Sequence, residues 1–115
     1  MRNLLEMLID ANYKFFKEKI KQESYTVVLA YTTMCGTCES AKKMLTIVSE
    51  ALSQISYLQI NVNLNQELIG EYNLTSVPSF LVYKEGELIE QFYAFHSVTY
   101  LFDKIKSLIN PGFFH

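Results

Sequence analysis

Cys35 and Cys38 are the only two cysteines in this chain of 115 residues, and Gly36 and Thr37 separate them. Thiols at this spacing can exchange between a dithiol and a disulfide, because residues three apart in a helix lie on one face. The same pair could instead supply two ligands to a metal ion, or could be two inert buried thiols. The segments on either side of the pair decide between these interpretations.

A metal site has little support in the sequence. A structural zinc ion takes four ligands, and one Cys-x-x-Cys motif supplies two of them. His96 and His115 are the only histidines, and both lie far from the pair in the sequence. We expect a complete site to need ligands from a second chain. Thiol–disulfide exchange is therefore the favoured interpretation, because it needs only the two thiols, whereas a zinc site needs further ligands.

An apolar segment and an amphipathic segment flank the pair. Residues 25–31 are continuously apolar and rich in β-formers, which predicts a strand covered on both faces, as in a parallel sheet. From Cys38 to Leu52 the apolar residues recur at helical spacing with charged residues between them, which predicts a helix. Cys35 would then lie where a buried strand ends and a helix begins, a position that argues against two inert thiols.

This junction favours the thiolate form of Cys35. The first backbone N–H groups of a helix have no partner within the helix, and the positive end of its dipole lies beside them. Both effects predict a pKa for Cys35 below the value of about 8.5 of a free cysteine. Gly36 leaves the sulfur uncovered, and Cys38 lies one turn further on, more buried. Cys35 is therefore predicted to attack a target disulfide, and Cys38 to resolve the mixed disulfide.

The other predicted elements complete an α/β fold. They are a helix over 3–21, a strand over 55–62, a helix over 66–72, a strand over 79–83, a turn over 84–87, a strand over 88–94, and a helix capped by Ser97 that ends at Pro111-Gly112. The first strand–helix–strand unit implies a parallel pair joined by a right-handed crossover. We expect one domain over residues 1–115, with a mixed central sheet flanked by helices on both faces.

Val77-Pro78 is the second functional feature. A proline at the start of a good strand is unusual unless it has a role. A cis bond in a tight turn is one such role. If Pro78 is cis and lies against the cysteine pair, the backbone of Val77 can pair with a strand of the substrate.

Composition and charge narrow the partners and the compartment. The formal net charge is −2 and no Lys/Arg cluster is present, so a nucleic-acid partner is not expected. No apolar run approaches the roughly 20 residues of a membrane span, and Glu6 and Asp10 interrupt the apolar start, against a secretory signal. We expect a cytoplasmic monomer, and in a reducing cytosol two cysteines are seldom a structural disulfide.

The chain resembles the thioredoxin family over roughly residues 3 to 110. The matching segments are the apolar strand before the motif, Cys35-Gly36-Thr37-Cys38, Asn61-Val62-Asn63, Ser76-Val77-Pro78-Ser79-Phe80 and Lys84-Glu85-Gly86-Glu87. This resemblance implies a thioredoxin fold, a cis Pro78, and a nucleophilic Cys35 resolved by Cys38.

The resemblance also implies how such a site works with its partners. Met34, Gly36, Thr37, Val77 and Pro78 would contact a protein substrate that contains a disulfide. No cofactor is expected beyond the redox-active Cys35–Cys38 disulfide. A reductase or a low-molecular-weight thiol would supply the electrons.

Several positions depart from the usual thioredoxin pattern. They are Met34 for tryptophan, Thr37 for proline, Leu29 for a buried aspartate, Gln59 for its lysine partner, Glu39 for lysine, Lys43 for a helix-kinking proline and Ala94 for glycine. Without an acid at Leu29, we expect slower turnover than in a standard thioredoxin. Glu39 is expected to oppose the Cys35 thiolate. The favoured function is reduction of protein disulfides; the alternative is a redox-sensing adaptor with little turnover.

Overall fold

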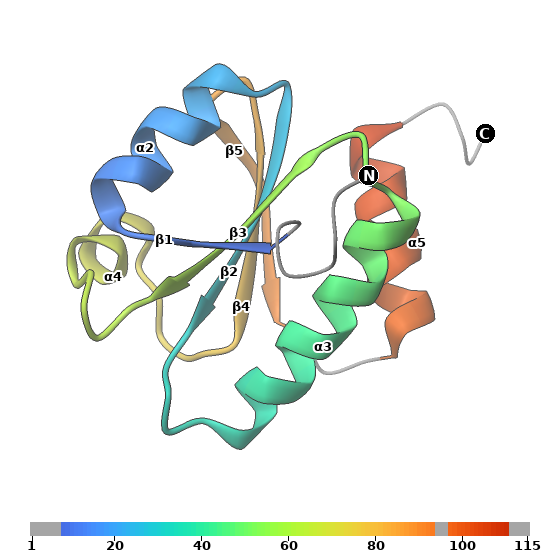
Figure 1. Cartoon of the computed structure of the whole chain (residues 1–115). Coiled ribbons are helices and arrows are strands. Elements are labelled where there is room, and N and C mark those ends of the chain that lie inside the picture. The colour runs from blue at the N-terminus through green and yellow to red at the C-terminus, as the bar shows by residue number, and fades with distance from the viewer. Residues whose placement is uncertain (1–7, 94–96, 111–115) are drawn as a thin grey trace.

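A five-stranded mixed sheet runs through the centre of the computed structural model, which describes residues 8–93 and 97–110 (Figure 1). The described elements, in chain order, are β1 (Leu8–Ala11), α2 (Tyr13–Gln22), β2 (Tyr25–Tyr31), α3 (Gly36–Ala51), β3 (Ser56–Asn61), α4 (Glu67–Tyr72), β4 (Ser79–Lys84), β5 (Glu87–Tyr93) and α5 (Val98–Ile109). Helices α2 and α4 cover one face of the sheet, and α3 and α5 cover the other. The mixed sheet with helices on both faces is confirmed.

The strand order places β2 at the centre of the sheet. The order is β1-β3-β2-β4-β5; β1, β3 and β2 are parallel, and β4 and β5 are antiparallel to their neighbours. Six of the seven residues of β2 are buried, which explains why its sequence lacks alternation. The carboxyl end of β2 therefore leaves the middle of the sheet and leads directly to the cysteine pair.

The predicted helix over 3–21 is wrong over Leu8–Ala11. Leu8–Ala11 form the edge strand β1, which pairs in parallel with β3, and the helix runs only from Tyr13 to Gln22. The Asn12 side chain caps that helix by accepting a hydrogen bond of 2.8 Å from the backbone N–H of Phe15. Pairing with β3 outweighs the local helical spacing of the apolar residues. Residues 3–7 of the predicted helix lie outside the described residues.

Two apolar cores hold the helices to the sheet. The core beneath α3 and α5 contains Cys38, Leu45, Leu101 and Ile105, all buried against inward-facing residues of β2 and β4. The core on the opposite face packs α2 and α4 on the same strands. None of the described helices is long and apolar enough to cross a membrane. Because α3 is anchored along its length, its first turn holds a fixed place beside the end of β2.

The β4–β5 turn and the α5 cap confirm two further predictions. Glu85 and Gly86 have φ angles of 51° and 88°, the left-handed pair of a two-residue hairpin turn. The Ser97 hydroxyl accepts a hydrogen bond of 3.2 Å from the backbone N–H of Tyr100 and so begins α5. The predicted ends at Ala94 and at Pro111-Gly112 lie outside the described residues.

Replacing Gly86 with alanine should lower the free energy of unfolding by about 1 kcal/mol, because its left-handed backbone disfavours a Cβ atom. Gly70→Ala is the matched control: Gly70 lies inside α4 and has open space around its Cβ position, so this change should be neutral or stabilising. Denaturant unfolding of both variants checks the pair. Equal effects of the two substitutions would contradict the account of the turn.

Candidate active site

Cys35 lies where the structure joins β2 to α3. It is the N-cap residue of α3, with an extended backbone, and its Sγ accepts a hydrogen bond of 3.2 Å from the backbone N–H of Cys38. The hydroxyl of Thr37 lies 3.2 Å from the same sulfur. A cysteine here does what an N-cap serine usually does, so the helix start itself supplies donors to the sulfur.

These contacts lower the pKa of the Cys35 thiol. The largest cause is the interaction with the Cys38 side chain, followed by the Thr37 hydroxyl, while partial burial acts in the opposite direction. Backbone N–H groups of Cys38 and Thr37 add smaller contributions of the same sign. The predicted lowering of the Cys35 pKa is confirmed, and part of it comes from a hydroxyl at the position where thioredoxins usually carry proline.

Cys38 has the opposite environment. Its side chain is 1% exposed and packs in the core beneath α3 and α5. Burial is the main reason that its pKa rises to about 11, with the hydrogen bond to Cys35 and the charge of Glu39 adding to the effect. The prediction that Cys38 is the more buried thiol is confirmed. The pair thus combines a thiol inclined to ionise with one inclined to stay protonated.

Glu39 acts on Cys38 in this structure, since its charge raises the Cys38 pKa. The expectation that it opposes the Cys35 thiolate stays a prediction.

The Val77-Pro78 bond is cis, as predicted. The carbonyl oxygen of Val77 lies 4.0 Å from the Cys35 sulfur, so residues 42 positions apart in the sequence meet at the site. Val77 also lines a mostly apolar hollow of about 170 Å³, together with Thr32, Val62, Ile69, Leu74, Thr75 and Ser76. We call this hollow the proline-side hollow.

α4 and the loop after it bring two residues to this hollow that the sequence did not predict for the site, Ile69 and Leu74. Ile69 is partly exposed in a short amphipathic helix, and Leu74 follows it in the loop before the cis-proline. The sequence offers no clear signal for them, because a helix of six residues has too few turns to show a reliable apolar face.

Met34 and Gly36 leave the Cys35 sulfur uncovered, whereas Cys38 is buried. Met34 is 91% exposed, and a Cβ atom built at Gly36 would meet no other atom within 4 Å. Both residues therefore border the Cys35 sulfur without covering it, as expected for Gly36. Ala94, the groove position predicted on the far side, lies outside the described residues.

The position of the missing acid is an apolar one. Leu29 is completely buried in β2 and is the direct register partner of Gln59 in β3. These two residues thus occupy adjacent places beneath α3 where the thioredoxin pattern has aspartate and lysine. Among residues 8–93 and 97–110, no three histidine, cysteine or acidic side chains gather in a way that could hold a metal ion.

Comparison with known proteins matches this site to a family. The thioredoxin family model covers residues 7–107 of the chain. The chain belongs to the thioredoxin family. A thioredoxin-like protein of Bacillus subtilis, YusE, is 45% identical over 89 residues, which cover 77% of this chain and 83% of that protein. The thioredoxin of the same bacterium is 38% identical over 76 residues, covering 60% and 69% of the two chains.

Solved structures confirm the thioredoxin fold. Oxidised mitochondrial thioredoxin 3 of Saccharomyces cerevisiae superimposes with a TM-score of 0.80 at 25% identity, covering 91% of this chain and 99% of its own. A mutant thioredoxin of Halobacterium salinarum reaches a TM-score of 0.81 at 19% identity, over 89% and 90% of the two chains. Membership of the family supports thiol–disulfide oxidoreductase chemistry at the Cys35–Cys38 pair.

Replacing Thr37 with valine should raise the pKa of Cys35, because the sulfur loses the hydrogen bond from the Thr37 hydroxyl, a contact of about 1 kcal/mol. Thr37→Ser keeps the hydroxyl and should titrate like the wild type. The ultraviolet absorbance of the thiolate as a function of pH measures both. A Thr37→Val protein whose lower titration is unchanged would show that the hydroxyl does not stabilise the thiolate.

Proposed function

We propose that this protein is a thiol–disulfide oxidoreductase that reduces disulfides of other proteins through Cys35 and Cys38. The observation that carries the proposal is the contrast between the two thiols. Cys35 receives hydrogen bonds at the open start of α3, whereas Cys38 is buried and has a pKa of about 11. A nucleophile that ionises first and a second thiol held in reserve are what stepwise exchange requires.

The reaction runs in two steps. The Cys35 thiolate attacks one sulfur of the target disulfide, forming a Cys35–target mixed disulfide and releasing the other target sulfur as a thiolate. Cys38 then loses its proton to solvent and attacks the Cys35 sulfur, which forms the Cys35–Cys38 disulfide and releases the second target thiolate. The target gains two electrons and the cysteine pair loses two.

The cis-proline loop is proposed to hold the target chain during the first step. Its Val77 carbonyl lies 4.0 Å from the Cys35 sulfur, so a target strand that pairs with the Val77 backbone at this edge would bring its own disulfide next to that sulfur. Pro78 fixes the direction of this carbonyl, and Met34, Gly36 and Thr37 border the sulfur. In this proposal the apolar side chains of the target enter the proline-side hollow.

The pair returns to its dithiol form with electrons from a reductase or a low-molecular-weight thiol, and it needs no bound cofactor. We further propose that the protein acts as a monomer in the cytosol. The cytosol suits this function, because a reducing compartment keeps such a pair in the dithiol form and available for turnover.

A second function, a redox-sensing adaptor with little turnover, is favoured by one feature. Resolution requires Cys38 to lose a proton, yet its pKa is about 11 and the neighbouring core position is Leu29, not an acid. A long-lived mixed disulfide or a slowly formed Cys35–Cys38 disulfide would suit a sensor that binds one partner in one redox state.

Reduction of insulin with dithiothreitol as electron donor separates the two functions. The wild-type protein should accelerate insulin reduction, and Cys35→Ser should abolish the acceleration because the nucleophile is lost. Cys38→Ser should instead accumulate a mixed disulfide with insulin, visible by mass spectrometry.

The outcome against the enzyme is equally definite. A wild-type protein whose Cys35–Cys38 disulfide forms and is reduced, but which does not accelerate insulin reduction, would exclude the general reductase and favour the adaptor. Thr33→Ser, a mild change close to the motif, is a control that should keep full activity.

A further inference from the structure

A second hollow opens beside the active site, at the carboxyl ends of the three parallel strands. Its volume is about 360 Å³, larger than the proline-side hollow of about 170 Å³. We call it the strand-end hollow. Its lining comes from the ends of β1, β2 and β3 and from the segments that follow β1 and β3; the residues are Asp10, Ala11, Asn12, Tyr31, Asn61, Leu64 and Asn65.

The two hollows adjoin each other across the end of the sheet. Tyr31 and Asn61 are register partners and line the strand-end hollow, whereas the next residues, Thr32 and Val62, line the proline-side hollow. A hydrogen bond of 3.0 Å from the Val62 N–H to the Tyr31 carbonyl ties this boundary together. A target chain bound at Cys35 beside one hollow is therefore within a few residues of the other.

The walls of the strand-end hollow are fixed by hydrogen bonds. The Asn65 side chain accepts a bond of 2.9 Å from the Tyr13 N–H and donates one of 2.9 Å to the Asn61 carbonyl, while the Asn12 oxygen caps α2. These amides are occupied in holding β1, β3 and α2 in place. The hollow is thus built before any ligand arrives.

Asp10 supplies the charge in the lining. Its Oδ1 accepts a hydrogen bond of 3.0 Å from the Tyr31 hydroxyl, and its other oxygen makes no hydrogen bond or ion pair with the described residues. Tyr31 stays a neutral donor, because burial raises its pKa to about 12. The result is a carboxylate oriented by one hydrogen bond, with its second oxygen available to a cation.

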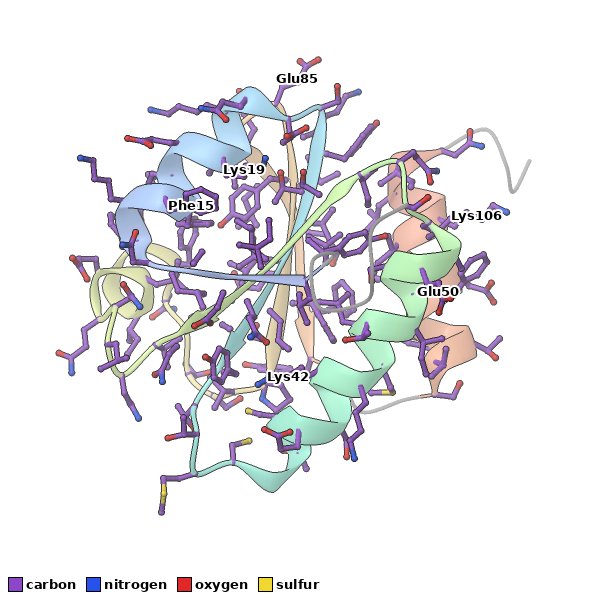
Figure 2. The ribbon with its side chains drawn as sticks, viewed as in Figure 1. Phe15, Lys19, Lys42, Glu50, Glu85 and Lys106 are labelled. Carbon is purple, nitrogen blue, oxygen red and sulfur yellow. The ribbon has the colours of Figure 1, made fainter. Side chains whose placement is uncertain are left out.

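The surrounding charges keep the hollow negative. Lys42 lies on α3 (Figure 2). Its ammonium group is 4.7 Å from the centre of the Tyr31 ring and 3.7 Å from the Glu39 carboxylate. The negative charge of Glu39 therefore balances the positive charge of Lys42, and the negative charge of Asp10 is left without a counter-charge in the lining. Leu64, 80% exposed, lines the same hollow and offers an apolar surface. A long side chain with an apolar stem and a positive head matches both features.

We propose that the strand-end hollow binds a lysine or arginine side chain of the target protein, close in sequence to the cysteine that Cys35 attacks. This inference rests on the proposed reductase function and adds a specificity determinant to it. Asp10 would pair with the positive head, and the exposed Leu64 would cover the stem. Asp10 is a binding residue here and takes no part in the exchange itself.

Symmetric peptide disulfides test the inference. In one series arginine is moved through the positions on either side of the cysteine, and in a second series citrulline replaces it, keeping shape but not charge. At the best position the wild-type protein should show a kcat/KM about fivefold higher for arginine, as for a partly exposed ion pair. This preference should fall as salt is added.

Asp10→Asn should bring the arginine-to-citrulline ratio to about one, because asparagine keeps the hydrogen bond to the Tyr31 hydroxyl but carries no charge. Asp103→Asn makes the same change of charge on α5, away from this hollow, and should keep the fivefold ratio.

Two results overturn the inference. One is equal reduction of arginine and citrulline peptides at every position; the other is a preference that survives in Asp10→Asn. A wild-type protein that reduces neither series contradicts the proposed reductase instead, so the two failures are distinguishable.

Discussion

The hydrogen bonds accepted by the Cys35 sulfur at the start of α3 are the contacts on which the site depends. They exist because α3 begins one residue after Cys35, and α3 begins there because its apolar face is anchored in the core from Cys38 to Val48. The buried strand β2 brings the chain to this point, and the cis Val77-Pro78 bond, just before β4, lies on the other side of the Cys35 sulfur. Packing thus determines the chemical difference between two otherwise identical thiols.

That difference also explains why family membership alone does not determine the behaviour of this protein. The core beside Cys38 holds Leu29 and Gln59 in register, so the resolving thiol has no acidic side chain at that position to take its proton. Thr37 adds a hydroxyl beside the Cys35 sulfur, which favours its thiolate. The Thr37 hydroxyl widens the gap between the pKa values of the two thiols. The absence of an acid at Leu29 is expected to slow the release of a target from the mixed disulfide.

Local sequence patterns predicted most of this fold and the centre of the site. The continuous apolar run of β2, the stripe of α3, the turn at Gly86 and the proline at position 78 each have a short-range physical cause, and the structure confirms them. The first strand was not predictable in this way, because Leu8–Ala11 follow a helical spacing and become a strand only by pairing with β3. For the same reason the two hollows beside Cys35 escaped prediction, since strand ends and loops far apart in the sequence build them.

The central claim is that the structure separates the pKa values of the two thiols, with Cys35 low and Cys38 high. Labelling the cysteine β-carbons and following their chemical shifts against pH in the reduced protein measures both values directly. The account predicts that Cys35 titrates below the value of about 8.5 of a free cysteine and that Cys38 titrates near a pKa of about 11. Two thiols that titrate together near the value of a free cysteine would contradict it.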